Sequence, residues 1–268
     1  MPLLHLIIIA VIQGITELLP ISSSAHLTIF PKITGSKDQG AIVDVAVHLG
    51  TLVAVICYFR NDSKKIFRGT VGLIRGKMLS KDSFLVMCLI IATIPACLIG
   101  LFLALTGFYD DLRNNVLLIG FAMVFFGLIL WWIDRTSTTR KYAHEWTLKQ
   151  ALILGLWQAI ALLPGTSRSG ITITGARFLG YKREDSIKIS MLMSIPVILA
   201  AAGIATQRAI EQADYLSLRD GFIAGVFSAI SAFIALSIMM RWLEKVSFTP
   251  YVVYRIVIGM FLILWAYN

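Results

Sequence analysis

Residues 18–26 read LLPISSSAH and residues 162–170 read LLPGTSRSG. Each stretch ends an apolar run at Leu-Leu-Pro and continues into a polar, serine-containing turn, where the neighbouring residues are apolar enough for a bilayer interior. Lipid offers no hydrogen-bond partners to a broken helix, so such turns persist only where protein encloses them or a watery cavity adjoins them. The two stretches therefore predict interrupted helices around a buried polar site.

The composition is that of an integral membrane protein. Of the 268 residues, 57% are hydrophobic and only 15% are charged, and the mean hydropathy is +0.80. Apolar runs of about 20 residues, long enough for a helix to cross a bilayer, recur along the chain. The formal charge of +9 is spread over short loops, which indicates topology and lipid headgroups and not nucleic acid as a partner. The three cysteines lie in apolar segments without the spacing of a disulfide or zinc site.

Six segments predict complete transmembrane helices, and two predict re-entrant hairpins. The hairpins, at residues 3–30 and 148–179, are apolar helices interrupted near their middles by the Leu-Leu-Pro turns. The complete spans are expected at residues 41–59, 84–105, 115–133, 187–206, 222–242 and 250–267. The predicted fold class is an all-α polytopic membrane protein that forms a single domain over residues 1–268.

The distribution of Lys and Arg predicts how these segments are oriented. Seventeen basic residues fall in four loops, 60–81, 135–149, 177–188 and 241–245, whereas only five fall in the opposite set: Lys32, Lys37, Arg113, Arg208 and Arg219. Because basic loops stay cytoplasmic, both termini are expected outside, and the two hairpins enter from opposite faces. This arrangement predicts an inverted-topology repeat, about 1–134 and 148–268, in which aligning the two prolines pairs residues 18–23 with 162–167.

The first hairpin carries groups suited to proton transfer and to a hard cation. Gln13 and Glu17 are four residues apart and share one helix face, and their oxygens together suit a divalent cation. Ser23 is a candidate nucleophile with Glu17 or His26 as its base, while Ser22 and the serine after Ser23 could equally cap the second half-helix. His26 is itself a candidate nucleophile, acid or base.

The second hairpin carries groups suited to an anion. Residues 164–170 combine a glycine turn, hydroxyl groups, backbone amides at a helix start and the guanidinium of Arg168. This combination favours phosphate, although no Gly-Lys-Ser/Thr follows to make a nucleotide-binding P-loop. Arg168 lies well inside its apolar run and not at a span end, which argues against a snorkelling role.

Four polar residues outside the hairpins are harder to assign. Asp44 and His48 are four residues apart early in a span and could support the site, or Asp44 could simply face the interface. Arg255 is expected to pair with a lipid phosphate or an acidic neighbour, and Tyr254 to be an interfacial anchor.

The spacing of these polar residues resembles that of a known family. The pattern Q-x-x-x-E-x-x-P-x-S-S-x-x-H over residues 13–26, with P-G-x-S-R-S-x-x-T over 164–172, resembles the undecaprenyl-diphosphate phosphatases of the bacitracin-resistance type. The likeness continues at residues 48–51 and 250–255. It implies a multi-pass enzyme of the bacterial inner membrane, with its active site facing the periplasm. Such an enzyme removes the terminal phosphate of C55 isoprenyl diphosphate, recycles the carrier for peptidoglycan synthesis and confers bacitracin resistance.

The resemblance also implies roles for particular residues. Glu17, Ser23, His26 and Arg168 would form the catalytic core, with a divalent cation, Mg or Ca, as the cofactor. Many family members carry Glu where this chain has Gln13, so Gln13 would join Glu17 as a metal ligand only through its amide oxygen. The nucleophile, Ser23 or His26, and a homodimer stay open, and the expected partners are the lipid substrate and membrane lipids. The expected substrate-binding residues are Ser22, Ser167, Ser169, Gly170 and Thr172.

A transporter or flippase of a phosphate-bearing lipid or anion is the competing function. Inverted repeats with broken helices near the membrane midplane are typical of secondary transporters, and a phosphate-binding cavity could move an anion. Clustering of Ser23, His26 and Glu17 exceeds what binding alone needs. It therefore favours an enzyme.

Overall fold

The structure, a computed structural model, describes residues 2–35, 40–211, 215–243 and 246–267, and the regular elements over these ranges are all helical. α1 (Leu3–Leu18) and α2 (Ser23–Thr34) form the first hairpin, and α8 (Leu148–Ile160) and α9 (Arg168–Phe178) form the second. The long helices are α3 (Ala41–Tyr58), α5 (Lys81–Thr106), α7 (Val116–Thr136), α10 (Arg183–Glu211), α11 (Tyr215–Leu243) and α12 (Thr249–Tyr267). The short elements are α4 (Arg60–Ile74), α6 (Phe108–Asn114) and the 3-10 helix η1 (Ala143–Glu145).

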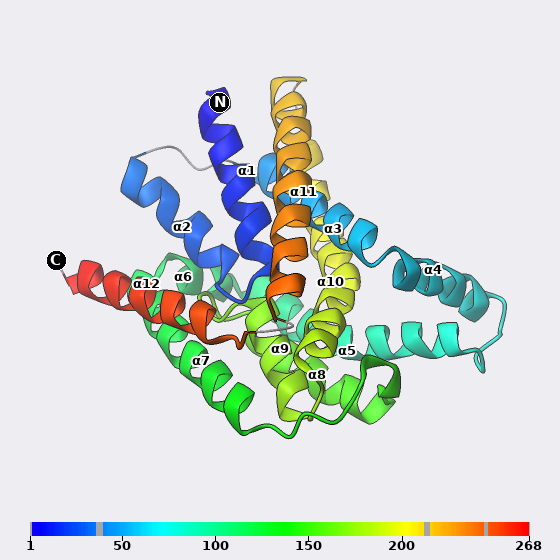
Figure 1. Ribbon diagram of the computed structural model, residues 1–268. Helices are drawn as coiled ribbons and strands as arrows, with labels where there is room; N and C mark the ends of the chain where they lie inside the picture. The colour runs from blue at the N-terminus through cyan, green and yellow to red at the C-terminus, as the bar shows by residue number, and fades with distance from the viewer. Residues whose placement is uncertain (1, 36–39, 212–214, 244–245, 268) are drawn as a thin grey trace.

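Helix length and hydropathy bear out a polytopic membrane protein. In the described chain, α5, α7, α10, α11 and α12 are each long and apolar enough to cross a membrane. α3 qualifies only together with α4, from which it is bent by 100°, and Figure 1 shows α4 and the start of α5 extending away from the bundle. The all-helical membrane class is confirmed, whereas the full count of six spans and two re-entrant hairpins stays a prediction.

The two hairpins break at serines with the same unusual backbone. Ser22 (φ +74°) and Ser167 (φ +71°) are the non-glycine residues of the described chain with positive φ, and each immediately precedes the second helix of its hairpin. By backbone conformation Ser22 corresponds to Ser167, a pairing one position away from the one that aligning the prolines predicts, because the second turn has one more residue between proline and serine; the repeat itself stays a prediction. In this register Gln13 pairs with Gln158, and both are buried with an unpartnered side-chain oxygen.

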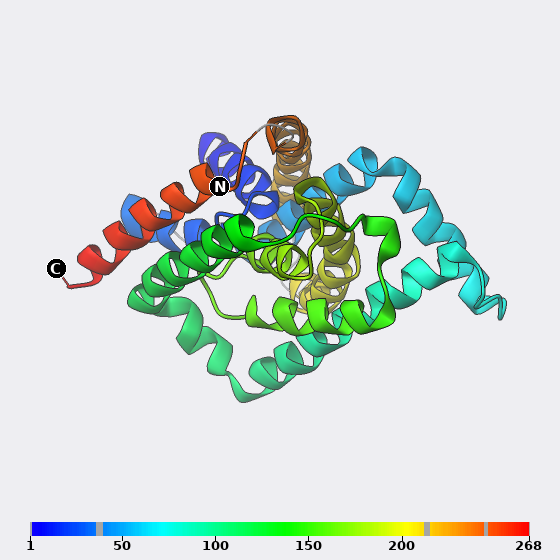
Figure 2. The same ribbon diagram turned by 60° about the horizontal axis from the view of Figure 1, so that its bottom comes forward.

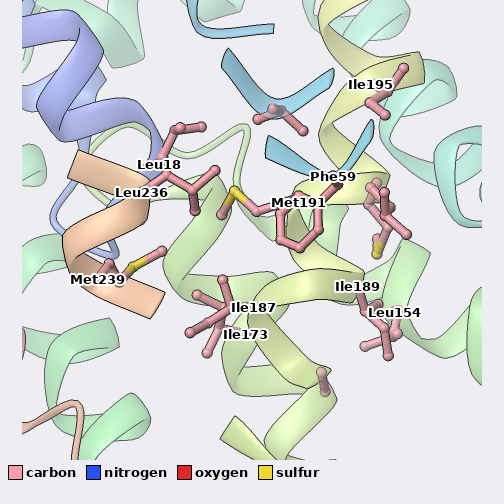
Figure 3. Packing of buried hydrophobic residues seen from close by; sticks show 14 of the residues in the cluster. Leu18, Phe59, Leu154, Ile173, Ile187, Ile189, Met191, Ile195, Leu236 and Met239 are labelled. Atoms are coloured by element: carbon pink, nitrogen blue, oxygen red, sulfur yellow. The ribbon is translucent and has the colours of Figure 1, made fainter. Parts of the chain in front are cut away.

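The apolar core surrounds the ends of the hairpins. Figure 3 shows Leu18 of α1 beside Leu236 of α11, with Met191 of α10 between them and Phe59. Ile173 of α9 belongs to the same buried cluster. The turn between α1 and α2 lies near the middle of the molecule, next to α9 (Figure 1), and α7, α8 and α10 surround α9 (Figure 2). Protein, not lipid, therefore encloses the polar turns, as the sequence predicts.

The first helix of each hairpin packs closely on one long helix. A Cβ atom on Gly14 of α1 would come within 2.5 Å of the Ser228 carbonyl oxygen in α11, and one on Gly155 of α8 within 2.8 Å of the Ala92 carbonyl oxygen in α5. Neither approach leaves room for a side chain. α1 thus relates to α11 as α8 relates to α5.

A buried carboxylate joins segments at the end of the molecule that carries the basic loops. Asp134, at the end of α7, accepts hydrogen bonds at 2.9 Å from Nε of both Arg177 in α9 and Arg183 in α10. It also accepts from the amide of Phe248, just before α12, at 3.5 Å. Three of the four loops predicted to share one side therefore meet at a single side chain.

The fourth basic loop lies at the same end, and the sparse set lies elsewhere. Nζ of Lys188 in α10 is 2.8 Å from Asp62 of α4, which places the 60–81 loop beside the α9–α10 loop. Lys32 of the opposite set donates to the carbonyl of Asn114 at 3.1 Å. These contacts place the described basic loops near one another, whereas the side of the membrane that they face stays a prediction. Lys37 and Lys245, which entered the count, lie outside them, as do the two terminal residues of the predicted domain.

Replacing Asp134 is expected to destabilise the protein strongly. The side chain of Arg177 is only 2% exposed, and Asp134→Ala would leave this guanidinium buried without a carboxylate, at a cost of about 3–5 kcal/mol. The measurement is thermal unfolding in detergent followed by circular dichroism. The control is Asp82→Ala, which removes the partner of Arg68, whose side chain is 66% exposed; that loss should stay below about 1 kcal/mol. Equal losses in the two variants would contradict the assignment.

Candidate active site

In the first hairpin a serine hydroxyl is hydrogen-bonded to a carboxylate. Ser23 Oγ donates to Glu17 Oε2 at 2.6 Å, and Gln13 Nε2 donates to the same oxygen at 3.1 Å. Gln13 reaches Glu17 because residues four apart share a helix face. Ser23 reaches it because the chain reverses at Pro20, which cannot supply an amide to continue α1. Glu17 is therefore in position to take the proton of Ser23.

The second hairpin brings a guanidinium to the same carboxylate. Arg168, the first residue of α9, donates from Nη2 to Glu17 Oε1 at 3.3 Å and from Nη1 to the Ser190 carbonyl of α10 at 3.0 Å. Ser169 donates its hydroxyl to the Leu19 carbonyl at 2.8 Å, so the two turns touch directly. The predicted meeting of the two motifs is thus present: Glu17 is bonded both to Ser23 and to Arg168.

The other hydroxyls of the second turn are engaged in shaping it. Ser167 Oγ accepts from the Gly170 amide at 3.1 Å and so caps α9. The hydroxyl of Thr172 is fully buried, donates to the Arg168 carbonyl at 2.8 Å and lies 2.6 Å from Ser190 Oγ. The first amides of a helix have no partners within it, so the start of α9 presents N–H groups beside Arg168, as an anion site requires.

The serines that flank Ser23 are bonded to each other. Ser22 Oγ and Ser24 Oγ are 3.2 Å apart, and Ser22, although it is the N-cap residue of α2, makes no side-chain capping bond. The capping role weighed for Ser22 is therefore absent here, whereas its equivalent Ser167 does cap its helix.

His26 faces α12 and not the serine. Its Nδ1 lies 2.7 Å from the Ser22 carbonyl, which can only accept, so Nδ1 carries the hydrogen and Nε2 is free to accept from the Tyr254 hydroxyl at 2.6 Å. The two rings also stack, with centroids 5.7 Å apart and planes 11° apart. No hydrogen bond joins His26 to Ser23 or Glu17 in the described part of the chain.

A different histidine lies beside the carboxylate of Glu17. His48 Nε2 lies 3.8 Å from Glu17 Oε2, and its Nδ1 donates to the Asp44 carbonyl at 2.7 Å. The side chain of His48 is 38% exposed, so this edge of the site is open. The carboxylate of Asp44 instead lies 3.8 Å from Arg113. Of the two residues that the sequence left open, His48 belongs to the site and Asp44 pairs elsewhere.

Two residues of α12 adjoin the candidate site. Tyr254, interpreted from the sequence as an interfacial anchor, is hydrogen-bonded to His26. The partner expected for Arg255, a lipid phosphate or an acidic neighbour, is wrong for the described residues: Arg255 is 1% exposed and donates to the Met123 carbonyl at 3.1 Å and to the Thr166 carbonyl in the second turn at 2.9 Å. The available signal was the arginine itself, because an ionisable residue inside a span is by default a functional candidate.

Gln13 and Glu17 fit a divalent cation. Gln13 Oε1 is buried without a hydrogen-bond partner in the described structure, next to a carboxylate. Over the same residues no group of three or more His, Cys, Asp and Glu side chains gathers at one place. Two protein oxygens completed by substrate oxygens and water are typical of magnesium at phosphate sites, whereas an all-protein cage is not needed.

Comparisons with known proteins cover the whole chain. The model of the family described as bacitracin resistance protein BacA matches residues 6–261. The chain is similar to the undecaprenyl-diphosphatases of Dinoroseobacter shibae and Ruegeria pomeroyi, each 52% identical over 268 residues with 100% of both chains covered. It is 42% identical over 267 residues to the undecaprenyl-diphosphatase of Saccharophagus degradans, with 99% of each chain covered.

Proposed function

The chain belongs to the bacitracin resistance protein BacA family, and we infer from this membership that it hydrolyses undecaprenyl diphosphate to the monophosphate and inorganic phosphate. Full-length relatives that are about half identical carry the name of this activity. The observation that carries the proposal within this chain is the carboxylate of Glu17, bonded to Ser23 at 2.6 Å and to Arg168 at 3.3 Å. A nucleophile, a base and a phosphate-binding cation meet there, as phosphoryl transfer requires.

We propose that Ser23 is the nucleophile. As Ser23 Oγ bonds to the terminal phosphorus, its proton passes to Glu17, and the bond from that phosphorus to the bridging oxygen breaks. The isoprenyl monophosphate leaves with the electron pair and takes the proton from Glu17. Water then attacks the phosphoserine, Glu17 accepts the proton of the water and returns it to Ser23 Oγ, and inorganic phosphate departs.

Arg168 and the start of α9 hold the diphosphate in this scheme. The guanidinium donates two separate hydrogen bonds, to Glu17 and to the Ser190 carbonyl, and phosphate oxygens can replace the carboxylate as its partner. The amides of Arg168 and Ser169, which precede the amides bonded to Ser167, add donors that need no reorganisation. Gln13 and Glu17 would hold a divalent cation, Mg or Ca, which neutralises phosphate charge when bound.

His26 is less suited to attack phosphorus. Its Nδ1 carries the hydrogen bonded to the Ser22 carbonyl, and its Nε2 lone pair is directed at the Tyr254 hydroxyl 2.6 Å away. Formation of a phosphohistidine would therefore first require one of these bonds to break, whereas Ser23 is already hydrogen-bonded to its proposed base, Glu17.

The proposed setting is the bacterial inner membrane, with six spans, two opposed re-entrant hairpins and a site that opens to the periplasm. Three features support the repeat. Ser22 and Ser167 share a positive φ. α1 approaches α11 closely through a glycine, as α8 approaches α5, and the basic loops lie at one end. The opening to the periplasm is supported by His48, which lies beside Glu17 and is partly exposed. One helical turn away, Asp44 pairs with Arg113, which belongs to the sparsely basic loops expected outside.

Phosphate release by the purified protein tests the function. With Mg²⁺ and a short prenyl diphosphate, we expect one inorganic phosphate and one prenyl monophosphate for each substrate consumed. A pure transporter would release no phosphate. Release of pyrophosphate with the free alcohol would place the cleavage at the wrong bond and contradict the mechanism.

Replacing Gln13 tests the cation site. Gln13→Leu removes the unpartnered buried oxygen, and the Mg²⁺ concentration for half-maximal activity should rise roughly 10-fold. The matched control is Gln158→Leu, at the equivalent position of the second hairpin, where Nε2 donates to the Ala92 carbonyl away from Glu17. Activity is titrated with Mg²⁺ after treatment with a chelator. An unchanged Mg²⁺ requirement in Gln13→Leu would remove Gln13 from the ligand set.

A further inference from the structure

Two consecutive residues of α12 reach the two different hairpins. Tyr254 bonds to His26 of the first hairpin, and Arg255 bonds to the turn of the second. Successive residues of a helix point about 100° apart, so one turn of α12 can touch both halves of the site. α12 itself packs along α7, which gives both contacts a common frame.

Arg255 is a buried cation without a carboxylate. Its Nη2 donates to the Gly165 carbonyl at 3.2 Å and to the Thr166 carbonyl at 2.9 Å, and its Nε donates to the Met123 carbonyl of α7 at 3.1 Å. No acidic side chain of the described chain lies within ion-pair distance of it. Burying a charge that carbonyl dipoles alone compensate is costly. The described residues therefore leave the positive charge of Arg255 without a negative partner.

The position of Arg255 indicates what supplies that charge. A Cβ atom on Gly170 would lie 2.8 Å from Arg255 Nη1, so the guanidinium lies directly behind the first turn of α9. This helix start is itself electropositive. A phosphate bound at the front of the turn, at Arg168, would place its negative charge between the two arginines.

Tyr254 fixes a side chain of the first hairpin, the imidazole of His26. The His26 ring is held at both nitrogens, by the Ser22 carbonyl at 2.7 Å and by the Tyr254 hydroxyl at 2.6 Å, and it stacks on the tyrosine ring. With the phenol removed, only the bond to its own helix would orient the imidazole.

We propose that Tyr254 and Arg255 are positioning residues that hold the two hairpins in one reactive geometry, and that the substrate's diphosphate is the counter-ion of Arg255. This inference rests on the proposed function and adds α12 to its machinery. Neither side chain needs to touch the reacting atoms. Arg255 acts through the carbonyls of the second turn. Tyr254 acts through His26, whose Nδ1 holds the carbonyl of Ser22, the residue directly before the nucleophile Ser23.

Conservative variants separate positioning from general stability. Tyr254→Phe keeps the stacking ring and should lower kcat roughly 10-fold, because a misplaced group costs catalysis more than binding, with KM within about twofold. Arg255→Lys keeps the charge but loses the fork to the carbonyls, and KM for a prenyl diphosphate should rise roughly 10-fold. The controls are Tyr267→Phe, at the exposed end of α12, and Arg75→Lys, after α4.

Two readouts do not depend on turnover. Inorganic pyrophosphate should raise the thermal midpoint of the wild-type protein through binding to the folded state, and Arg255→Gln, which removes the charge, should lose most of that rise while the controls keep it. In ¹⁵N-histidine-labelled protein, the Nε2 resonance of His26 should shift in Tyr254→Phe. An inactive wild type that pyrophosphate still stabilises, with the rise lost in Arg255→Gln, would refute the proposed function and leave the anion role of Arg255 standing.

Specific results would overturn the inference. Unchanged kcat and unchanged His26 resonances in Tyr254→Phe would remove Tyr254 from it, and an undiminished pyrophosphate effect in Arg255→Gln would show that the diphosphate is not the counter-ion. If Arg255→Gln does not fold, Arg255→Lys decides the charge arm: because it keeps the charge, it should keep most of the pyrophosphate effect, and complete loss of the effect in a folded Arg255→Lys would contradict a role for the charge.

Discussion

Ser23→Ala is expected to lower kcat by about a thousandfold or more. In the proposed mechanism the variant removes the oxygen that attacks phosphorus, and His26 cannot replace it while its two nitrogens are bonded to the Ser22 carbonyl and Tyr254. Arg168, the proposed diphosphate-binding residue, lies on the other hairpin and stays in place, so the thermal stabilisation by pyrophosphate should be preserved. Loss of activity with retained binding is the signature of a missing nucleophile.

Single-turnover assays and a trapped intermediate measure this effect. Quenching with denaturant at neutral pH, which preserves both phosphoserine and phosphohistidine, followed by mass spectrometry should locate phosphate on Ser23 in the wild-type protein and on no residue in Ser23→Ala. The matched control is Ser237→Ala in α11, where the hydroxyl donates only to the Phe233 carbonyl of its own helix. Phosphate found on His26, or activity within tenfold of wild type, would overturn the assignment of the nucleophile.

Arg168→Ala is expected to lower kcat/KM by about a thousandfold. The guanidinium is the cation bonded to Glu17, and its loss removes both a phosphate partner and the charge that opposes the carboxylate. Arg168→Lys keeps the charge without the planar fork that spans Glu17 and the Ser190 carbonyl. It should therefore recover only part of the activity.

Turnover and folding must be followed together in these variants. Arg168→Ala leaves Glu17 buried without its cation, so a lower unfolding midpoint should accompany the lost activity. Glu17→Gln in the same background would relieve the unpaired charge and restore the midpoint without restoring turnover. The control is Arg140→Ala, in the basic loop after α7. Full activity in Arg168→Lys would show that charge alone suffices and that the two-pronged contact has no role.

Hydrophobic periodicity and the cost of polar groups in lipid allowed much of the fold to be predicted from the sequence. Each expected span coincides with a helix, and both hairpins break at the Leu-Leu-Pro turns, where a proline without an amide is followed by a polar turn. Proline alone does not decide this, because Pro31, Pro95 and Pro196 lie inside continuous helices. Aligning the two prolines differs by one residue from aligning the two turns by backbone conformation. The feature that the two turns share is a backbone conformation, at Ser22 and Ser167, and sequence similarity does not report φ.

The residues of the site that lie outside its two motifs were harder to predict from the sequence. Glu17 and Ser23 are close in sequence, so their contact could be anticipated. His48 and Tyr254 gave only weak signals. A histidine early in a span and a tyrosine near the end of the chain are common, and nothing local indicates that one lies beside Glu17 and the other beside His26.

The sequence by itself determined that the chain is a helical membrane protein, that two of its helices break, and which residue types stand at each break. These properties follow from local chemistry: hydropathy, the missing amide of proline and the cost of polar groups in lipid. The tertiary structure alone decided that Glu17 meets Arg168, 151 positions away, that His26 turns to α12, and that Arg255 is buried behind the second turn. Those contacts depend on how α7, α9 and α12 pack against one another, and no local pattern encodes the packing of distant helices.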